Sequence, residues 1–115
     1  MTATATSGCP VFAGRRDRLR AALAAMGHDA LLVSHAANRF YLSGFELHDP
    51  QCNETAGYVV VTADGDDYLF TDARYRDAAL RLWPEQHLCI YGAGRYAVIA
   101  DFLKARGVAR LGFEP

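Results

Sequence analysis

The sequence predicts an α/β fold of three layers, in which helices cover both faces of a mixed β-sheet. Asp64-Gly65 separates two runs of β-forming residues, and this pattern predicts an antiparallel hairpin. Two strand–helix–strand units follow the hairpin, and such units favour parallel neighbouring strands. The chain has 115 residues, 51% of them apolar, which suits one domain with its own core.

The N-terminal segment is rich in Thr, Ala and Ser and has no periodicity, so we expect residues 1–12 to form a flexible arm. Residues 13–115 then form the folded domain. Its first expected element is a helix over residues 13–26, which Gly27 ends. The apolar stripe of this helix is expected to comprise Leu19, Leu23 and Met26.

A buried strand is expected at residues 29–34 (DALLVS), which form a short apolar run between turn signals. Asn38 is expected to cap a short helical turn over residues 38–42, and Gly44 closes it. The following stretch, residues 44–57, is polar and has no periodicity. A loop of this length in a compact domain is often functional.

The predicted hairpin pairs residues 58–62 (YVVVT) with residues 68–71 (YLFT). Asp72 stands where a helix N-cap is expected. The helix that follows is predicted over residues 73–82, and Pro84 ends it.

The C-terminal part of the chain predicts a strand, a helix and a strand. Residues 87–91 (HLCIY) form the first strand, and residues 109–113 (ARLGF) form the last one. Between them, residues 95–106 predict a helix with Gly107 as its C-cap. The buried stripe of this helix is expected to comprise Tyr96, Ile99 and Leu103.

The formal net charge of the chain is −1, which argues against nucleic acid as a partner because phosphate binding needs a basic excess. One basic cluster stands out near the N-terminus. We interpret it as a solvated helix face rather than an anion site. The cluster comprises Arg15, Arg16, Arg18 and Arg20.

The cysteines are widely spaced, odd in number and form no C-x-x-C pair, so a reduced, cytoplasmic protein is expected. The N-terminus has no apolar run typical of a signal peptide. No apolar stretch is long enough to cross a membrane, and we expect no membrane partner.

Three segments in this order resemble the N-terminal domain of the creatinase/prolidase/aminopeptidase P family. Residues 38–45 (NRFYLSGF) resemble its N-x-x-Y-L-[ST]-G-F signature. Residues 69–75 (LFTDARY) resemble its junction of a strand, Asp-x-Arg-Tyr and a helix. Residues 111–114 (LGFE) are similar to a closing strand that ends in Glu. The resemblance implies a creatinase N-terminal-domain-like fold, with a sheet motif similar to that of ribonuclease H.

These motifs are expected to have structural roles first. Tyr41, Leu42 and Phe45 are expected to anchor the turn in the core, and Gly44 allows a positive φ angle. Asp72 is expected both to cap a helix and to pair with Arg74. The residues assigned to this structural motif are Asn38, Gly44, Asp72, Arg74, Tyr75 and Glu114.

The resemblance implies an accessory domain, which helps to build a dimer and forms part of the rim of the partner's active site. Polar groups on a rigid scaffold suit recognition of a substrate end. The candidate rim residues are Arg39, Tyr41, Phe45, Glu46, His48, Asp49 and Glu54.

The resemblance also implies a partner, a C-terminal catalytic domain that this chain lacks. In the peptidases of the family that domain holds a divalent metal pair (Mn, Co or Zn), whereas creatinase works without metal. No metal, cofactor or catalytic residue is expected in this chain. The parent is expected to be a metal-dependent Xaa-Pro aminopeptidase or dipeptidase, with a creatinase-like hydrolase as the alternative. An excised domain and a natural stand-alone copy both remain open.

The best rival signal is the turn at residues 92–97 (GAGRYA), which fits G-x-G-x-x-[GA]. It follows a predicted strand and opens a helix, with Glu114 about 20 residues on, as a dinucleotide site requires. The rival function is therefore a small nucleotide-binding module. A stand-alone interaction domain is the third possibility.

Overall fold

The computed structural model describes residues 10–45 and 57–114. One five-stranded mixed sheet has the strand order β4-β3-β2-β1-β5. The strands are β1 (Ala30–Val33), β2 (Gly57–Thr62), β3 (Asp67–Asp72), β4 (Leu88–Tyr91) and β5 (Leu111–Phe113). The helices are α2 (Pro10–Ala25), α3 (Ala36–Ser43), α4 (Arg76–Leu80) and α5 (Arg95–Ala105), with short 3₁₀ turns η1 (Ala73–Tyr75) and η2 (Glu85–His87).

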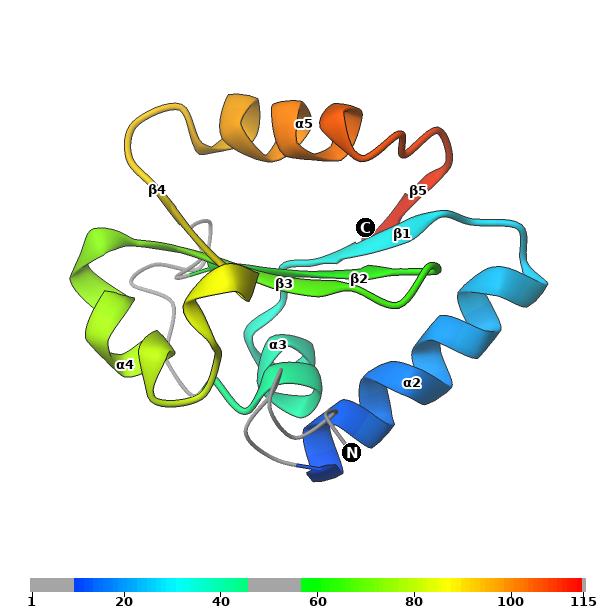
Figure 1. Cartoon of the computed structure of the whole chain (residues 1–115), viewed down its shortest axis with the longest axis horizontal. Helices are drawn as coiled ribbons and strands as arrows, with labels where there is room; N and C mark the ends of the chain where they lie inside the picture. The colour runs from blue at the N-terminus through cyan, green and yellow to red at the C-terminus, as the bar shows by residue number, and fades with distance from the viewer. Residues whose placement is uncertain (1–9, 46–56, 115) are drawn as a thin grey trace.

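Helices cover both faces of the sheet, as the sequence predicts. In Figure 1, α5 lies above the sheet, and α2, α3 and α4 lie below it. We call the lower side the α2–α4 face and the upper side the α5 face. Because both faces are covered, β2 is buried along its whole length. Its side chains alternate, so that Val59 and Val61 join the core of the α2–α4 face while Tyr58 and Val60 join that of the α5 face.

The predicted hairpin is present as the antiparallel pair β2–β3. Strands β3 and β4 are parallel neighbours, as expected for a strand–helix–strand unit. The second such unit differs from the expectation. Strand β5 pairs in parallel with β1, so β4 and β5 stand at opposite edges of the sheet and α5 crosses the sheet between them (Figure 1). Periodicity predicted the helix but contained no information about which strand the chain returns to.

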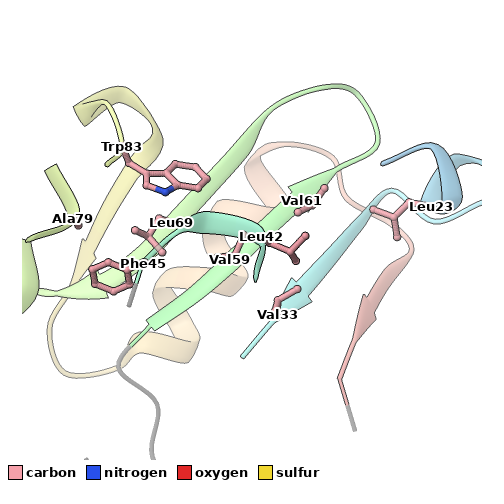
Figure 2. Packing of buried hydrophobic residues seen from close by; sticks show 9 residues of the cluster. All are labelled: Leu23, Val33, Leu42, Phe45, Val59, Val61, Leu69, Ala79 and Trp83. Carbon is pink, nitrogen blue, oxygen red and sulfur yellow. The ribbon is translucent and has the colours of Figure 1, made fainter. Parts of the chain in front are cut away.

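The core of the α2–α4 face brings together residues that lie far apart in the sequence. Figure 2 shows Trp83 and Phe45 beside Leu69, with Leu42 of α3 and Leu23 of α2 along the same side of the sheet. The indole Nε1 of Trp83 donates a hydrogen bond of 3.1 Å to the Ser43 carbonyl, which satisfies its buried donor. This bond joins the segment after α4 to the end of α3.

Two predicted boundaries near the N-terminus are wrong. Helix α2 begins at Pro10, so residues 10–12 belong to a helix rather than to an arm. Proline suits this position because the first helical residue needs no backbone donor. The predicted turn at residues 38–42 is a longer helix, α3, whose N-cap position is His35 rather than Asn38. Gly44 closes α3 with φ of 76°, as expected.

The predicted helical stripes hold in part. In α2, Leu23 is buried, but Met26 at its end is 63% exposed. In α5, Ile99 and Leu103 are buried, whereas Tyr96 is 67% exposed because it lies in the first turn, beyond the apolar core. In the part of the chain that the structure describes, no helix has the length and apolar character needed to span a membrane.

The arginine cluster of α2 is not a uniformly solvated face. Arg16 is only 2% exposed, and its Nε lies 2.8 Å from Oδ2 of Asp67, which also receives Arg20 at 2.7 Å. The Arg16 guanidinium further donates to the Leu42 carbonyl at 2.6 Å. Burial raises the pKa of the Asp67 carboxyl, against the opposing effect of the two cations. Arg16 and Arg20 therefore anchor α2 to β3, and Arg16 also anchors it to the end of α3.

Candidate functional site

The start of α3 is held by a carboxylate from the other end of the chain. His35 at the N-cap position provides no side-chain cap of its own. Instead, Oε1 of Glu114 accepts hydrogen bonds from the backbone amides of Ser34 at 2.6 Å and His35 at 2.8 Å. A negative charge at this position interacts favourably with the positive end of the helix. Glu114, directly after β5, therefore fixes α3 to the edge of the sheet.

Asn38 completes this arrangement rather than capping the helix itself. Its Nδ2 donates to Oε2 of Glu114 at 2.5 Å. Desolvation raises the pKa of the Glu114 carboxyl, but the hydrogen bonds from His35, Asn38 and Ser34 outweigh it, and the net pKa is lowered. The sequence motifs at residues 38–45 and 111–114 thus meet in space.

Arg39, a candidate rim residue, is an interior residue in this structure. Its side chain is 0% exposed. Nη1 donates to the carbonyls of Ser34 at 3.0 Å and Gly57 at 3.1 Å, so that it links α3 to the end of β1 and the start of β2. A buried guanidinium that bonds backbone carbonyls positions the chain and does not present itself to a partner.

Phe45 is also an interior residue, 1% exposed, within the core of the α2–α4 face. Its amide donates to the Ser43 hydroxyl at 3.0 Å. Gly44 between them adopts a left-handed conformation, and a Cβ there would lie 2.8 Å from the Phe12 ring. The predicted anchoring role holds for Leu42 and Phe45, which are buried, but it is wrong for Tyr41, which is half exposed. Burial also removes Phe45 from an exposed rim.

Tyr41 is the described rim candidate that reaches the surface, with 50% of its area exposed. The Arg15 guanidinium lies 4.2 Å from the centroid of its ring and donates to its carbonyl at 3.0 Å. Both residues line a groove of about 400 Å³ between α2, α3 and strand β1. The floor of the groove is apolar, and its members include Leu19, Leu31, Val33 and Leu42.

Asp72 and Arg74 adopt the predicted arrangement. Oδ1 of Asp72 accepts from the Arg74 amide at 2.8 Å and caps the turn η1. Nη2 of Arg74 lies 2.6 Å from Oδ2 of the same carboxylate, and the guanidinium stands 5.0 Å from the Tyr75 ring centroid. The carboxylate of Asp72 thus both caps η1 and pairs with Arg74.

The remaining rim candidates, Glu46, His48, Asp49 and Glu54, lie outside the described residues. Within residues 10–45 and 57–114, no group of three or more His, Cys, Asp or Glu side chains could hold a metal ion.

The turn at residues 92–97 joins β4 to α5 as predicted, but the dinucleotide interpretation fails at Glu114. That carboxylate binds the start of α3, and its strand β5 is separated from β4 by the three other strands. It therefore cannot bind a ribose beside the turn.

Sequence reasoning missed the buried Arg16 and its partner Asp67. A signal existed, because Arg16 shares one helical face with Leu19 and Leu23 at spacings of three and seven residues. An arginine within an apolar stripe indicates a buried ion pair, although the partner 51 residues away has no local signature.

Comparison with known proteins decides the family. The sequence model of the creatinase/prolidase N-terminal domain family matches residues 15–115. This chain belongs to that family. No curated protein matches the chain. Its domain resembles the N-terminal domain of the cytoplasmic peptidase PepQ from Mycobacterium tuberculosis H37Rv, with 42% identity and a TM-score of 0.72, over 88% of this chain and 72% of that chain.

Two further structures of Xaa-Pro peptidases are similar. The Xaa-Pro aminopeptidase from Streptococcus pyogenes has 31% identity and a TM-score of 0.73, over 90% of this chain and 73% of that chain. The Xaa-Pro dipeptidase from Bacillus anthracis has 25% identity and a TM-score of 0.73, over 90% of this chain but only 27% of that chain. The creatinase-type fold expected from the three motifs is therefore confirmed.

Proposed function

We propose that this chain is a non-catalytic accessory domain of a larger, cytoplasmic Xaa-Pro peptidase. The observation that supports the proposal is that the polar side chains of the family motifs form their hydrogen bonds within the domain. The polar groups of Glu114, Asn38 and Arg39 form hydrogen bonds that hold α3 in place. Asp72 and Arg74 form an ion pair with each other. Side chains committed in this way support a scaffold rather than a reaction centre.

Similar proteins support a division of labour within the parent enzyme. The chain spans 27% of the Bacillus anthracis Xaa-Pro dipeptidase, which leaves most of that enzyme beyond the matched domain. We place the chemistry, with its divalent metal pair, in a C-terminal catalytic domain of this kind. A creatinase-like parent is the alternative, since the family model covers both types.

The proposed contact surface includes the exposed ring of Tyr41. Tyr41 lies on α3, whose first residues bond Glu114 and whose Arg39 bonds the Gly57 carbonyl at the start of β2. The polar residues Glu46, His48, Asp49 and Glu54 follow α3 in the sequence, and we include them in the proposed rim on that ground alone. A rigid helix that presents an aromatic ring suits an interface with a partner subunit's catalytic cleft, because aromatic residues and arginine dominate such contacts.

The rim role is tested by Tyr41→Ala in a full-length peptidase that carries this domain. We expect KM to rise about tenfold while kcat stays nearly constant, since the contact binds substrate and transition state alike. Steady-state kinetics measure both constants, and light scattering measures the oligomer mass. The matched control is Lys104→Ala, an exposed residue of α5 on the opposite face. If Tyr41→Ala leaves KM and the oligomer mass unchanged, the rim role is wrong.

A further inference from the structure

The four arginines of α2 divide into two pairs. Arg16 and Arg20 are four positions apart on the helix, and both bond Asp67. Arg15 and Arg18 are three positions apart, and both line the groove beside α3. In the part of the chain that the structure describes, neither Arg15 nor Arg18 forms an ion pair with a carboxylate. The second pair therefore gives the groove positive charge that the described domain does not neutralise.

The guanidinium of Arg15 is held in place by its neighbours. It lies 4.2 Å from the centroid of the Tyr41 ring and 5.3 Å from that of Phe12. Its Nη1 donates to the Tyr41 carbonyl at 3.0 Å, which uses one of its five N–H donors. Arg18 is exposed and follows one turn later on α2. A guanidinium that is already ordered loses less conformational freedom when it binds a ligand.

The floor of the same groove is apolar. Val33 of β1 and Leu42 of α3 are buried, and Figure 2 shows them near each other on this side of the sheet. Leu19 and Leu31 are only half-buried, so each keeps apolar surface that a ligand can cover. The volume of about 400 Å³ falls within the range of about 300–1,000 Å³ that is typical of small-molecule sites. Such sites combine an apolar lining with a few polar groups.

One acidic side chain, Glu114, also lines the groove. Its Oε1 accepts hydrogen bonds from the amides of Ser34 and His35, and its Oε2 accepts one from Asn38. Both oxygens are therefore engaged at the start of α3, where the positive end of the helix balances their charge. The unbalanced charge of the groove is that of the two guanidinium groups. A complementary ligand combines an apolar body with one anionic group.

We propose that the groove between α2, α3 and β1 binds a small aliphatic carboxylate. Its carboxylate lies between Arg15 and Arg18, and its hydrocarbon chain covers Leu19 and Leu31. The planar guanidinium group suits this role because it can donate two parallel hydrogen bonds to one carboxylate. For this pair of arginines, the proposal replaces the solvated helix face that the sequence predicts with an anion site.

The proposal goes beyond the accessory role, because it requires neither a catalytic domain nor the cleft of a partner subunit. Tyr41 belongs to both proposals. The two remain separable, since the rim role is measured by the KM of a full-length peptidase and the groove is measured by binding to the 115-residue chain alone.

The test titrates the 115-residue chain with octanoate at pH 7 and constant ionic strength, below the concentration at which octanoate self-associates. Two-dimensional NMR follows the backbone amides, and we expect saturable shifts at Leu19, Leu31 and Tyr41. Hexanoate and butanoate should bind more weakly, by up to about fourfold for each methylene that is no longer buried. Octan-1-ol has the same chain without the charge and should bind about fivefold more weakly than octanoate.

The matched variants are Arg18→Gln and Arg81→Gln. Arg18→Gln removes a charge from the groove and should weaken octanoate binding about fivefold while it leaves octan-1-ol binding unchanged. Arg81 is an exposed arginine at the end of α4, and Arg81→Gln should bind like the unchanged chain. Because both positions are exposed, both variants should keep the dispersed spectrum of a folded chain.

Three results would overturn the proposal. The first is the absence of saturable shifts in the groove with octanoate. The second is equal octanoate affinity of the unchanged chain and Arg18→Gln, which would mean that the charge has no part in binding. The third is binding of an acetylated peptide that ends in leucine without binding of octanoate, which would assign the groove to a peptide end instead.

Discussion

The two faces of the sheet bury different chemistry. The α2–α4 face buries charge, in Arg16 with Asp67 and in Arg39, which bonds backbone carbonyls. The α5 face buries aromatic rings, and Phe102 stands edge-on to both Tyr68 and Phe70 at centroid distances of 4.7 and 5.1 Å. The family motifs at residues 38–45 and 111–114 meet at α3 on the charged face. The family motifs at residues 38–45 and 111–114 therefore supply hydrogen bonds that anchor α3. The core cluster of the opposite face consists of apolar and aromatic residues.

The largest loss of stability is expected on the aromatic face. Phe70→Ala removes a fully buried ring and leaves a cavity, because Phe102 and Tyr68 keep their backbone positions. We expect the free energy of unfolding to fall by about 3–5 kcal/mol. Urea denaturation followed by circular dichroism measures it. Phe70→Leu should recover a large part of the loss, and equal losses in both variants would contradict a packing origin.

On the charged face, Arg16→Ala should cost about 3 kcal/mol, because it leaves the Asp67 carboxylate buried with only Arg20 beside it. Arg18→Ala is the matched control in the same helix, since Arg18 is exposed, and should change stability by less than about 0.5 kcal/mol. Thermal unfolding of both variants tests the contrast. Similar melting temperatures for the two would show that the cluster is solvated after all.

A smaller effect is expected at the start of α3. Glu114→Gln weakens the cap and should cost about 1 kcal/mol near pH 7. The pKa of Glu114 is lowered in the folded state, so its contribution is present above the unfolded pKa and is lost as pH falls through the folded pKa. The stability difference between the two proteins should therefore shrink below about pH 4.5, the ordinary pKa of the group. A difference that stays constant down to pH 3 would contradict the cap.

Elements with local signals could be predicted from the sequence. The hairpin at Asp64-Gly65, the left-handed Gly44 and the Asp72 cap each depend on residues within a few positions of one another. The misses that matter for the site were non-local. The bonds from Ser34 and His35 to Glu114 span 80 and 79 residues, and nothing in residues 109–113 indicates that their strand pairs with β1. Burial of Arg39 likewise depends on the β2 carbonyl that it reaches.

The central claim is that this chain is a non-catalytic domain of a larger peptidase. The most direct test is whether the chain alone hydrolyses a peptide substrate. The purified 115-residue chain is incubated with Xaa-Pro dipeptides and added manganese or cobalt, beside an intact Xaa-Pro peptidase as the positive control. We predict no hydrolysis above that of the metal ions alone. Hydrolysis that rises in proportion to the concentration of the chain would contradict the account.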